Sequence, residues 1–238
     1  MTSSVDLSGK IALVTGASRG IGEAISKAYA KAGAHVILLA RSQRPLEKLH
    51  DEIVGTGGKA TIMPVNLLDL DSLDHLGPTI YERFGALDIF VGNAGLLGTL
   101  GPLTHADSKE FDDVMTCNVN ANFRLIRTLD PLLKQSKAGR CIFVSTGASV
   151  TKGRAYWGAY SASKASLEAL VRVYADECSN TNIKVNMIDP GVVRTEMRKS
   201  AVPGEDPMSL PAPEDITSEF LNLASEDCTE NSEIIRLR

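Results

Sequence analysis

The chain has 238 residues, 43% hydrophobic and 23% charged, which are the proportions of a globular protein that can bury one substantial core. Its formal net charge is −4 with acidic and basic residues interspersed, which excludes a nucleic acid or an anionic membrane surface as the expected main partner. The four cysteines form no C-x-x-C pair, the N-terminus has no signal pattern, and no apolar run approaches the ~18 residues of a membrane span. We therefore expect a cytoplasmic protein with no metal site.

Short apolar runs rich in β-branched residues alternate with helical segments along the chain. The runs span residues 11–16, 35–40, 60–65, 87–92, 140–145 and 183–188, and a further one, SEIIRLR, ends the sequence. Segments 22–32 and 44–53 have helical character. This alternation predicts an α/β fold, a Rossmann-type doubly wound parallel sheet of about seven strands with helices on both faces. No break resembles a linker, so residues 1–238 are predicted to form a single domain.

The first apolar run leads directly into a glycine-rich turn, TGASRGIG, at residues 15–22. Glycines permit a sharp turn after the strand, a close approach of backbone to a phosphate, and close packing of the next helix on the sheet. The helix would then direct its free N–H groups at an anion. The spacing G-x-x-x-G-x-G differs from the usual G-x-G-x-x-G, but its place after the first strand predicts a dinucleotide site. The expected contacts are Gly16, Ser18, Arg19, Gly20, Ile21 and Gly22.

The residues after the second strand bear on the choice of cofactor. A site for NAD usually has a carboxylate here for the ribose diol, but the sequence reads Ala40-Arg41-Ser42. Arg41 can bind a 2′-phosphate through bidentate, charge-assisted hydrogen bonds, and Arg19 can add a second positive charge. NADP(H) is therefore predicted in preference to NAD. The alternative is that Arg41 is simply a solvated residue at a strand end.

Four motifs together resemble one protein family. TGASRGIG, Asn93-Ala94-Gly95, Tyr160-x-x-x-Lys164 and Pro190-Gly191 follow one another in the order and spacing of the short-chain dehydrogenase/reductase family, over essentially the whole chain. The resemblance implies an oxidoreductase that transfers a hydride between NADP(H) and a carbonyl or secondary alcohol substrate, such as a 3-oxoacyl thioester or a small ketone. It also implies a homodimer or homotetramer.

The resemblance extends to individual positions. Asn118 matches a helix asparagine that holds a water for proton relay. Asn66 stands where the family commonly has Asp near the adenine, and its carboxamide oxygen can still accept a hydrogen bond there. The cofactor contacts implied beyond the glycine turn and Arg41 are Ser42, Asn66, Leu67, Asn93, Ala94, Gly95, Tyr160, Lys164, Pro190, Gly191, Val193 and Thr195.

Tyr160 and Lys164 are four residues apart and would share one helix face. A free tyrosine has a pKa near 10, too high for efficient acid–base catalysis at neutral pH. One ammonium about 4 Å away contributes ~4 kcal/mol at an effective dielectric constant near 20, enough to lower that pKa by ~3 units. We therefore expect Lys164 to lower the pKa of Tyr160, which would protonate the substrate carbonyl oxygen.

The third catalytic group of the family, a serine after the fifth strand, has more than one candidate here. Ser145 and Thr146 both lie slightly further from Tyr160 than the family serine does, which a one-residue insertion would explain. Either hydroxyl can donate to a substrate carbonyl, so both remain candidates, and Ser149 is a weaker third.

Residues 196–215 contain four of the ten prolines and are predicted to form a long loop with short helical pieces. Such loops often act as substrate lids, although a variable surface connection is the alternative. Two other functions fit the same fold. A non-enzymatic dinucleotide-binding sensor should lack the tyrosine or the lysine, and a sugar-nucleotide epimerase or dehydratase needs more chain than the 43 residues after Thr195.

Overall fold

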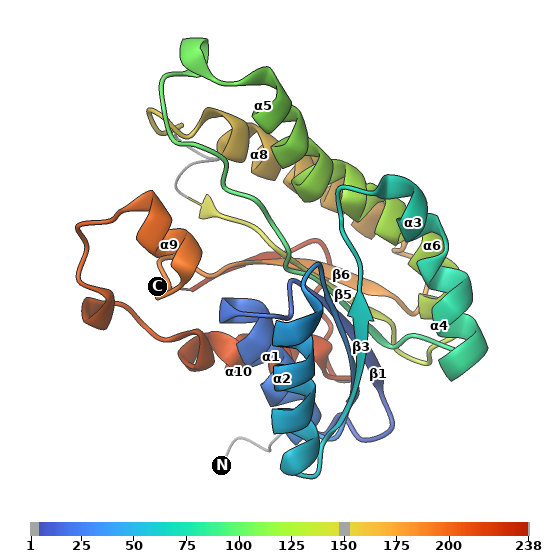
Figure 1. The fold of residues 1–238 in the computed structure, drawn as a ribbon. Helices are drawn as coiled ribbons and strands as arrows, with labels where there is room; N and C mark the ends of the chain where they lie inside the picture. Colours follow the sequence, from blue (N-terminus) through green and yellow to red (C-terminus); the bar gives the residue numbers. More distant parts are fainter. Residues whose placement is uncertain (1–4, 148–152, 238) are drawn as a thin grey trace.

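The computed structural model describes residues 5–147 and 153–237. A parallel sheet lies at its centre, with strand order β3-β2-β1-β4-β5-β6-β7 (Figure 1). The strands are β1 (Ile11–Thr15), β2 (His35–Ala40), β3 (Lys59–Pro64), β4 (Ile89–Gly92), β5 (Arg140–Val144), β6 (Lys184–Asp189) and β7 (Ile234–Arg236). Strand order reverses between β1 and β4, and in such sheets ligands bind at that crevice, beyond the carboxyl ends of the strands.

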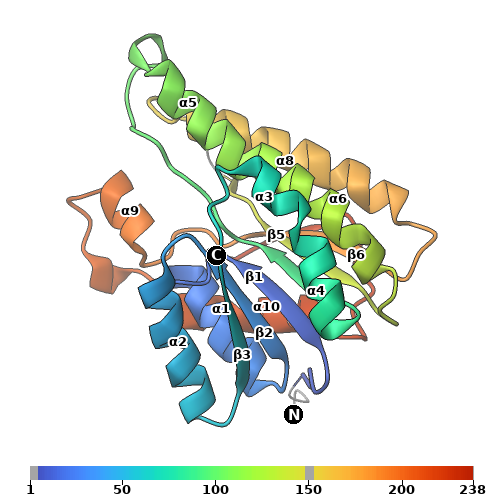
Figure 2. The ribbon, with the colours of Figure 1, turned by 45° about the vertical axis from the view of Figure 1, so that its right-hand side comes forward.

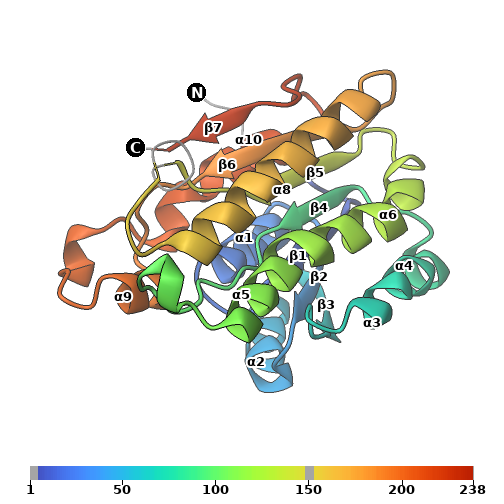
Figure 3. The same cartoon turned by 90° about the horizontal axis from the view of Figure 1, so that it is seen from above.

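Helices cover both faces of the sheet (Figures 2 and 3). One face carries α1 (Gly20–Lys31), α2 (Gln43–Gly55) and α10 (Thr217–Ala224). The other carries α3 (Leu70–Asp74), α4 (Leu76–Phe84), α5 (Ser108–Met115), α6 (Ala121–Leu133) and α8 (Gly158–Glu177). The predicted doubly wound α/β fold is therefore confirmed.

Two hydrophobic cores, one on each face, account for the continuous apolar runs of the strands. Phe90 and Phe143 point to the α8 side, where their rings meet edge to face at 5.4 Å. Their strand neighbours Val91 and Ile142 belong to the core on the α1 side. Because successive side chains alternate across a strand, a sheet covered on both faces needs apolar residues at nearly every position.

The proline-rich segment 196–215 contains α9 (Glu196–Ala201) and the short 3₁₀ turns η3 (Pro207–Ser209) and η4 (Pro213–Ile216). The predicted loop with short helical pieces is therefore observed. Thr195 caps α9 by accepting a hydrogen bond from the N–H of Arg198 (3.1 Å). The guanidinium of Arg198 in turn makes two 2.6 Å hydrogen bonds to the carboxylate of Glu205, which fastens the segment to itself.

All four cysteines are buried free thiols. In residues 5–147 and 153–237, no helix is long and apolar enough to cross a membrane. Nor do three or more His, Cys, Asp or Glu side chains gather into a group that could hold a metal ion anywhere in those residues.

Candidate active site

The glycine turn between β1 and α1 forms a cradle that side chains would block. Gly16 and Gly20 have φ angles of +66° and +57°, which favour glycine. A Cβ atom on Gly22 would lie 2.3 Å from the carbonyl oxygen of Gly16. Arg19 precedes α1 without a side-chain cap, so its side chain leaves the first N–H groups of that helix available to a ligand. A phosphate is the ligand that this arrangement suits.

Thr15 ties the glycine turn to the Asn93–Gly95 motif. Its hydroxyl donates to the carbonyl of Val91 (3.1 Å) and accepts from the N–H groups of Asn93 (3.0 Å) and Ala94 (3.1 Å). The carboxamide of Asn93 donates back to the Thr15 carbonyl (2.8 Å). Sequence reasoning did not single out Thr15, although a threonine at the end of an apolar strand was a visible signal.

The residues after β2 and β3 extend the site beyond the glycine turn. Arg41 and Ser42 are exposed at the end of β2. They lie beside the glycine turn, because the N–H of Ala17 in that turn donates to the carbonyl of Leu39 in β2 (3.1 Å). Among the described residues, no carboxylate forms an ion pair with Arg41. Asn66 is also exposed, its side-chain oxygen accepting from the N–H of Leu68 (3.2 Å), whereas Leu67 is buried.

The loop after β6 reaches the glycine turn from the other side. Gly191 has a φ of +66° and donates its N–H to the carboxylate of Asp189 (3.1 Å). Val193 is buried, and a Cβ on Gly20 would lie 3.4 Å from Cγ2 of Thr195. The glycine turn, the Asn93–Gly95 motif and the Pro190–Thr195 loop therefore meet at one place. The cradle and the uncapped N–H groups fit a nicotinamide dinucleotide, and Arg41, which pairs with no carboxylate among the described residues, fits its 2′-phosphate.

Tyr160 and Lys164 lie on the buried face of α8. Tyr160 is 9% exposed and Lys164 only 3%. The ammonium of Lys164 lies 5.9 Å from the centre of the Tyr160 ring and donates to the carbonyl of Val144, at the end of β5 (2.7 Å). Burial lowers the pKa of Lys164 to about 8.

The pKa of Tyr160 is raised to about 12, by burial and then by the negative charge of Asp189. This corrects the prediction that Lys164 lowers it. The predicted lowering required the ammonium to lie about 4 Å from the phenol oxygen. In the structure the ammonium faces the carbonyl of Val144, while burial and Asp189 disfavour the phenolate. At neutral pH the phenol of Tyr160 is therefore protonated.

Asn118 is fully buried in a π-helical turn, η2 (Thr116–Asn120). Its carboxamide accepts from the N–H of Leu96 (2.8 Å) and donates to the Leu96 carbonyl (2.9 Å) and the Ser163 hydroxyl (2.9 Å). A Cβ on Gly95 would lie 3.3 Å from the Asn118 side-chain oxygen and 3.7 Å from the Lys164 nitrogen. The structure thus brings Asn118, Gly95 and Lys164 together, with the Asn118 side chain engaged by Leu96 and Ser163.

Ser145 and Thr146 have different surroundings. Ser145 is 2% exposed, and its hydroxyl donates to the carboxylate of Glu168 on α8. That carboxylate also pairs with Arg172 at 3.2 Å. Thr146 is half-buried, and its hydroxyl has no hydrogen-bond partner in the part of the chain that the structure describes. Ser149, the third candidate, lies outside the described residues. The sequence analysis did not identify Glu168 as part of the site. The one signal for it was its position four residues after Lys164, on the same face of the helix.

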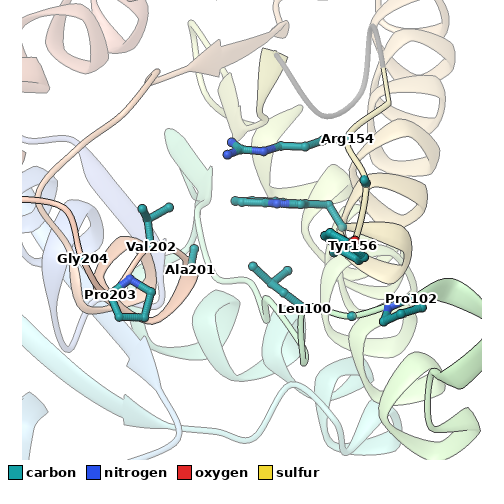
Figure 4. A pocket seen from close by; sticks show the side chains of 11 residues that line it. Leu100, Pro102, Arg154, Tyr156, Ala201, Val202, Pro203 and Gly204 are labelled. Atoms are coloured by element: carbon teal, nitrogen blue, oxygen red, sulfur yellow. The ribbon is translucent and has the colours of Figure 1, made fainter.

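A cleft of about 580 Å³ opens in front of the N-terminus of α8 and is lined in part by Trp157 (Figure 4). Three segments line it: residues 100–102 after β4, residues 154–157 before α8, and residues 201–204 of the proline-rich segment. The Trp157 ring in its wall lies edge to face with the Tyr160 ring at 5.9 Å. Tyr160 is therefore separated from the cleft by one aromatic ring, that of Trp157, and sequence reasoning located only the proline-rich side of the cleft.

Comparisons with known proteins agree with this arrangement. Residues 10–206 match the family model described as short chain dehydrogenase. The chain is 40% identical over 224 residues to the uncharacterized oxidoreductase YciK of Escherichia coli K12, covering 93% of this chain and 88% of the relative. A short chain dehydrogenase from Shigella flexneri 2a, complexed with NADP, superposes with a TM-score of 0.94 at 38% identity, over 98% of this chain and 99% of that one. One from Escherichia coli CFT073, complexed with NADPH, has a TM-score of 0.92 at 38% identity, over 99% of both chains.

Proposed function

The chain belongs to the short chain dehydrogenase family, and we propose that it is an NADP(H)-dependent oxidoreductase that interconverts a carbonyl compound and its secondary alcohol. The observation that carries the proposal is the buried Tyr160–Lys164 pair, in which Lys164 lies beside Gly95 of the cofactor motif and Tyr160 contacts Trp157 in the wall of a substrate-sized cleft. A non-enzymatic dinucleotide sensor is the weaker alternative to an enzyme, because a sensor does not need the Tyr160–Lys164 pair. A cytoplasmic location and a homo-oligomeric state are part of the same proposal.

The preference for NADP(H) rests on residues of this chain and on its neighbours. The glycine turn would bind the pyrophosphate, while Arg41, with Arg19 and Ser42 nearby, would bind the 2′-phosphate. Asn66 and Leu67 would border the adenine. The Asn93–Gly95 motif and the Pro190–Thr195 loop would contact the nicotinamide half. Solved neighbours that contain NADP or NADPH support this choice.

When bound, NADPH would supply the hydride that the substrate carbonyl carbon accepts. Tyr160 holds its proton on the phenol oxygen at neutral pH, since its pKa is about 12, and donates it to the carbonyl oxygen. Lys164 keeps most of its positive charge there, because its pKa is about 8, and its ammonium beside Gly95 would bind the nicotinamide half of the cofactor. Thr146 is the hydroxyl that would orient the carbonyl, because Glu168 holds that of Ser145.

The remaining residues position these groups. Asn118 fixes the backbone of Leu96 and the Ser163 hydroxyl, and so locks α8 against the segment after β4. The 196–215 segment acts as the lid, since its residues 201–204 form one wall of the cleft. We propose a 3-oxoacyl thioester or a small ketone as the substrate.

A screen for NADPH oxidation over ketones, aldehydes and 3-oxoacyl thioesters tests the proposal, with NADH run in parallel. Tyr160→Phe should abolish turnover of any substrate found while NADPH still binds. Tyr81→Phe, at an exposed tyrosine of α4, is the matched control and should keep full activity. Retained turnover in Tyr160→Phe would refute the role of Tyr160, and a clear preference for NADH would refute that of Arg41.

A further inference from the structure

The cleft lined by Trp157 is apolar except at one point. Leu100, Pro102, Val202 and Pro203 line it together with smaller residues and two aromatic ones. Arg154 is the one charged side chain among the described lining residues. Figure 4 shows it extending across the cleft toward the side of Val202. An apolar site with a single placed charge selects for a ligand that carries the opposite charge.

The guanidinium of the exposed Arg154 contacts an aromatic ring but no carboxylate among the described residues. It lies over the Trp157 ring, 4.9 Å from the ring centre. No ion pair to it occurs within residues 5–147 and 153–237. Glu205, across the cleft, has its pKa lowered first by its hydrogen bonds to Arg198 and only weakly by Arg154. Because both oxygens of Glu205 accept from Arg198, that carboxylate is already committed.

The segment that carries Arg154 is held to the rest of the site by its backbone. Trp157 forms a bridge with Gly101, whose N–H donates to the Tyr156 carbonyl (3.0 Å). Tyr156 has a φ of +75°, a value that aromatic residues rarely adopt. Backbone in such a conformation persists only where its surroundings determine it, and often at functional sites. The backbone from which the Arg154 side chain starts is therefore fixed relative to the wall of the cleft.

The Trp157 ring lies between the proposed acid, Tyr160, and the cation, Arg154. The Tyr160 and Trp157 rings are 5.9 Å apart, and the Arg154 guanidinium stacks on the latter ring. We propose that Arg154 binds an anionic group of the substrate, so that the enzyme prefers carbonyl compounds with an apolar body between the carbonyl and a carboxylate or phosphate. This inference rests on the proposed oxidoreductase function, since it names the class of carbonyl compound that the same cleft takes.

Trp157 allows the subsite to be tested by binding, independently of turnover. It is the only tryptophan of the chain, so intrinsic tryptophan fluorescence reports on this cleft alone. The probes are two matched pairs, 4-acetylbenzoate with 4-acetylbenzamide, and acetoacetyl-CoA with the neutral acetoacetyl N-acetylcysteamine thioester. The first pair tests a carboxylate on the substrate, and the second tests the phosphates of a thioester carrier.

We expect the anionic member of at least one pair to bind about tenfold more tightly than its neutral partner, as one charge-assisted contact at an exposed site allows. Arg154→Gln should abolish that preference and leave the affinity of the neutral probe unchanged. Lys199→Gln removes an exposed cation of α9 that does not line the cleft, and it should keep the preference. The pair that responds identifies the source of the anion.

Equal affinities within both pairs, an unchanged preference in Arg154→Gln, or no fluorescence response to any probe would overturn the subsite. The kcat/KM values for the same ketones separate this failure from that of the proposed function. Reduction of both members with equal kcat/KM values, unaffected by Arg154→Gln, would leave the oxidoreductase standing without the subsite. Arg154-dependent binding without reduction of any carbonyl compound would contradict the proposed function and support the anion site.

Discussion

The different surroundings of Ser145 and Thr146 predict opposite effects of removing each hydroxyl. Ser145 is 2% exposed and donates to the Glu168 carboxylate, whereas the Thr146 hydroxyl has no partner among the described residues. Ser145→Ala should therefore destabilise the fold and largely keep activity. Thr146→Val, which conserves shape and removes the hydroxyl, should keep stability and lose activity.

The magnitudes follow from the two environments. The side chain of Glu168 is 8% exposed, and without Ser145 its one hydrogen-bonding partner among the described residues is Arg172. Loss of a buried hydrogen bond to a charged group lowers the free energy of unfolding by about 1.5–3 kcal/mol. Loss of a donor to the developing oxyanion reduces kcat by about 10²–10³-fold, equivalent to roughly 2.7–4 kcal/mol.

Urea denaturation and kcat/KM for one NADPH-dependent substrate measure the two effects on the same samples. Ser166→Ala is the control on α8, because that hydroxyl bonds only the carbonyl of Ala162 in its own helix (2.9 Å). It should change the free energy of unfolding by less than about 0.5 kcal/mol and leave kcat/KM unchanged. A Ser145→Ala variant that keeps its stability and loses activity, with an active Thr146→Val variant, would refute the reasoning.

Two further predictions concern the acid–base pair and the cradle. The pKa of Lys164, about 8 against 10.5, is lower in the folded protein, so the unfolded chain holds more protons between these pH values and stability rises with pH across them. Lys164→Met should therefore abolish turnover but raise the free energy of unfolding at pH 7 by about 1–3 kcal/mol. Urea denaturation should show this gain in stability becoming smaller between pH 8 and 10.5. A gain that does not change with pH would contradict the prediction. Gly22→Ala, whose Cβ would lie 2.3 Å from the Gly16 carbonyl oxygen, should weaken NADPH binding by more than about tenfold in a fluorescence titration. Gly55→Ala, which meets no atom within 4 Å, is its control, and equal NADPH affinities would contradict the prediction.

The fold and the cofactor cradle could be predicted because their signals are local. Each strand appears in the sequence as a short apolar run, and the glycine turn is a contiguous stretch of residues 15–22. The strand predicted at 35–40 agrees with the observed His35–Ala40, and most others shift by only one or two residues at an end. The parallel order of the strands follows from the alternation with helices.

Contacts between distant segments limited the prediction of the site. Spacing alone left Ser145 and Thr146 as equal candidates for the hydroxyl that orients the substrate. What distinguishes them is the hydrogen bond from Ser145 to the buried Glu168, 23 residues later in the sequence. The pKa of Tyr160 was predicted in the wrong direction, because burial and the charge of Asp189 on β6 act through the folded structure. No motif pointed to Arg154, whose isolation in an apolar cleft depends on three separate segments.

The sequence by itself therefore determined which groups are present: a phosphate-binding turn, an arginine in place of an acid after β2, and a tyrosine–lysine pair on one helix face. The tertiary structure decided which of these groups are buried, charged or already bonded. Turn formation and strand periodicity depend on residues adjacent in the chain, whereas burial and electrostatic interactions depend on side chains brought together by folding. For this reason the sequence predicts the chemistry of Tyr160, while the surroundings of Ser145, Thr146 and Arg154 emerge only when β5, α8 and the lid are packed together.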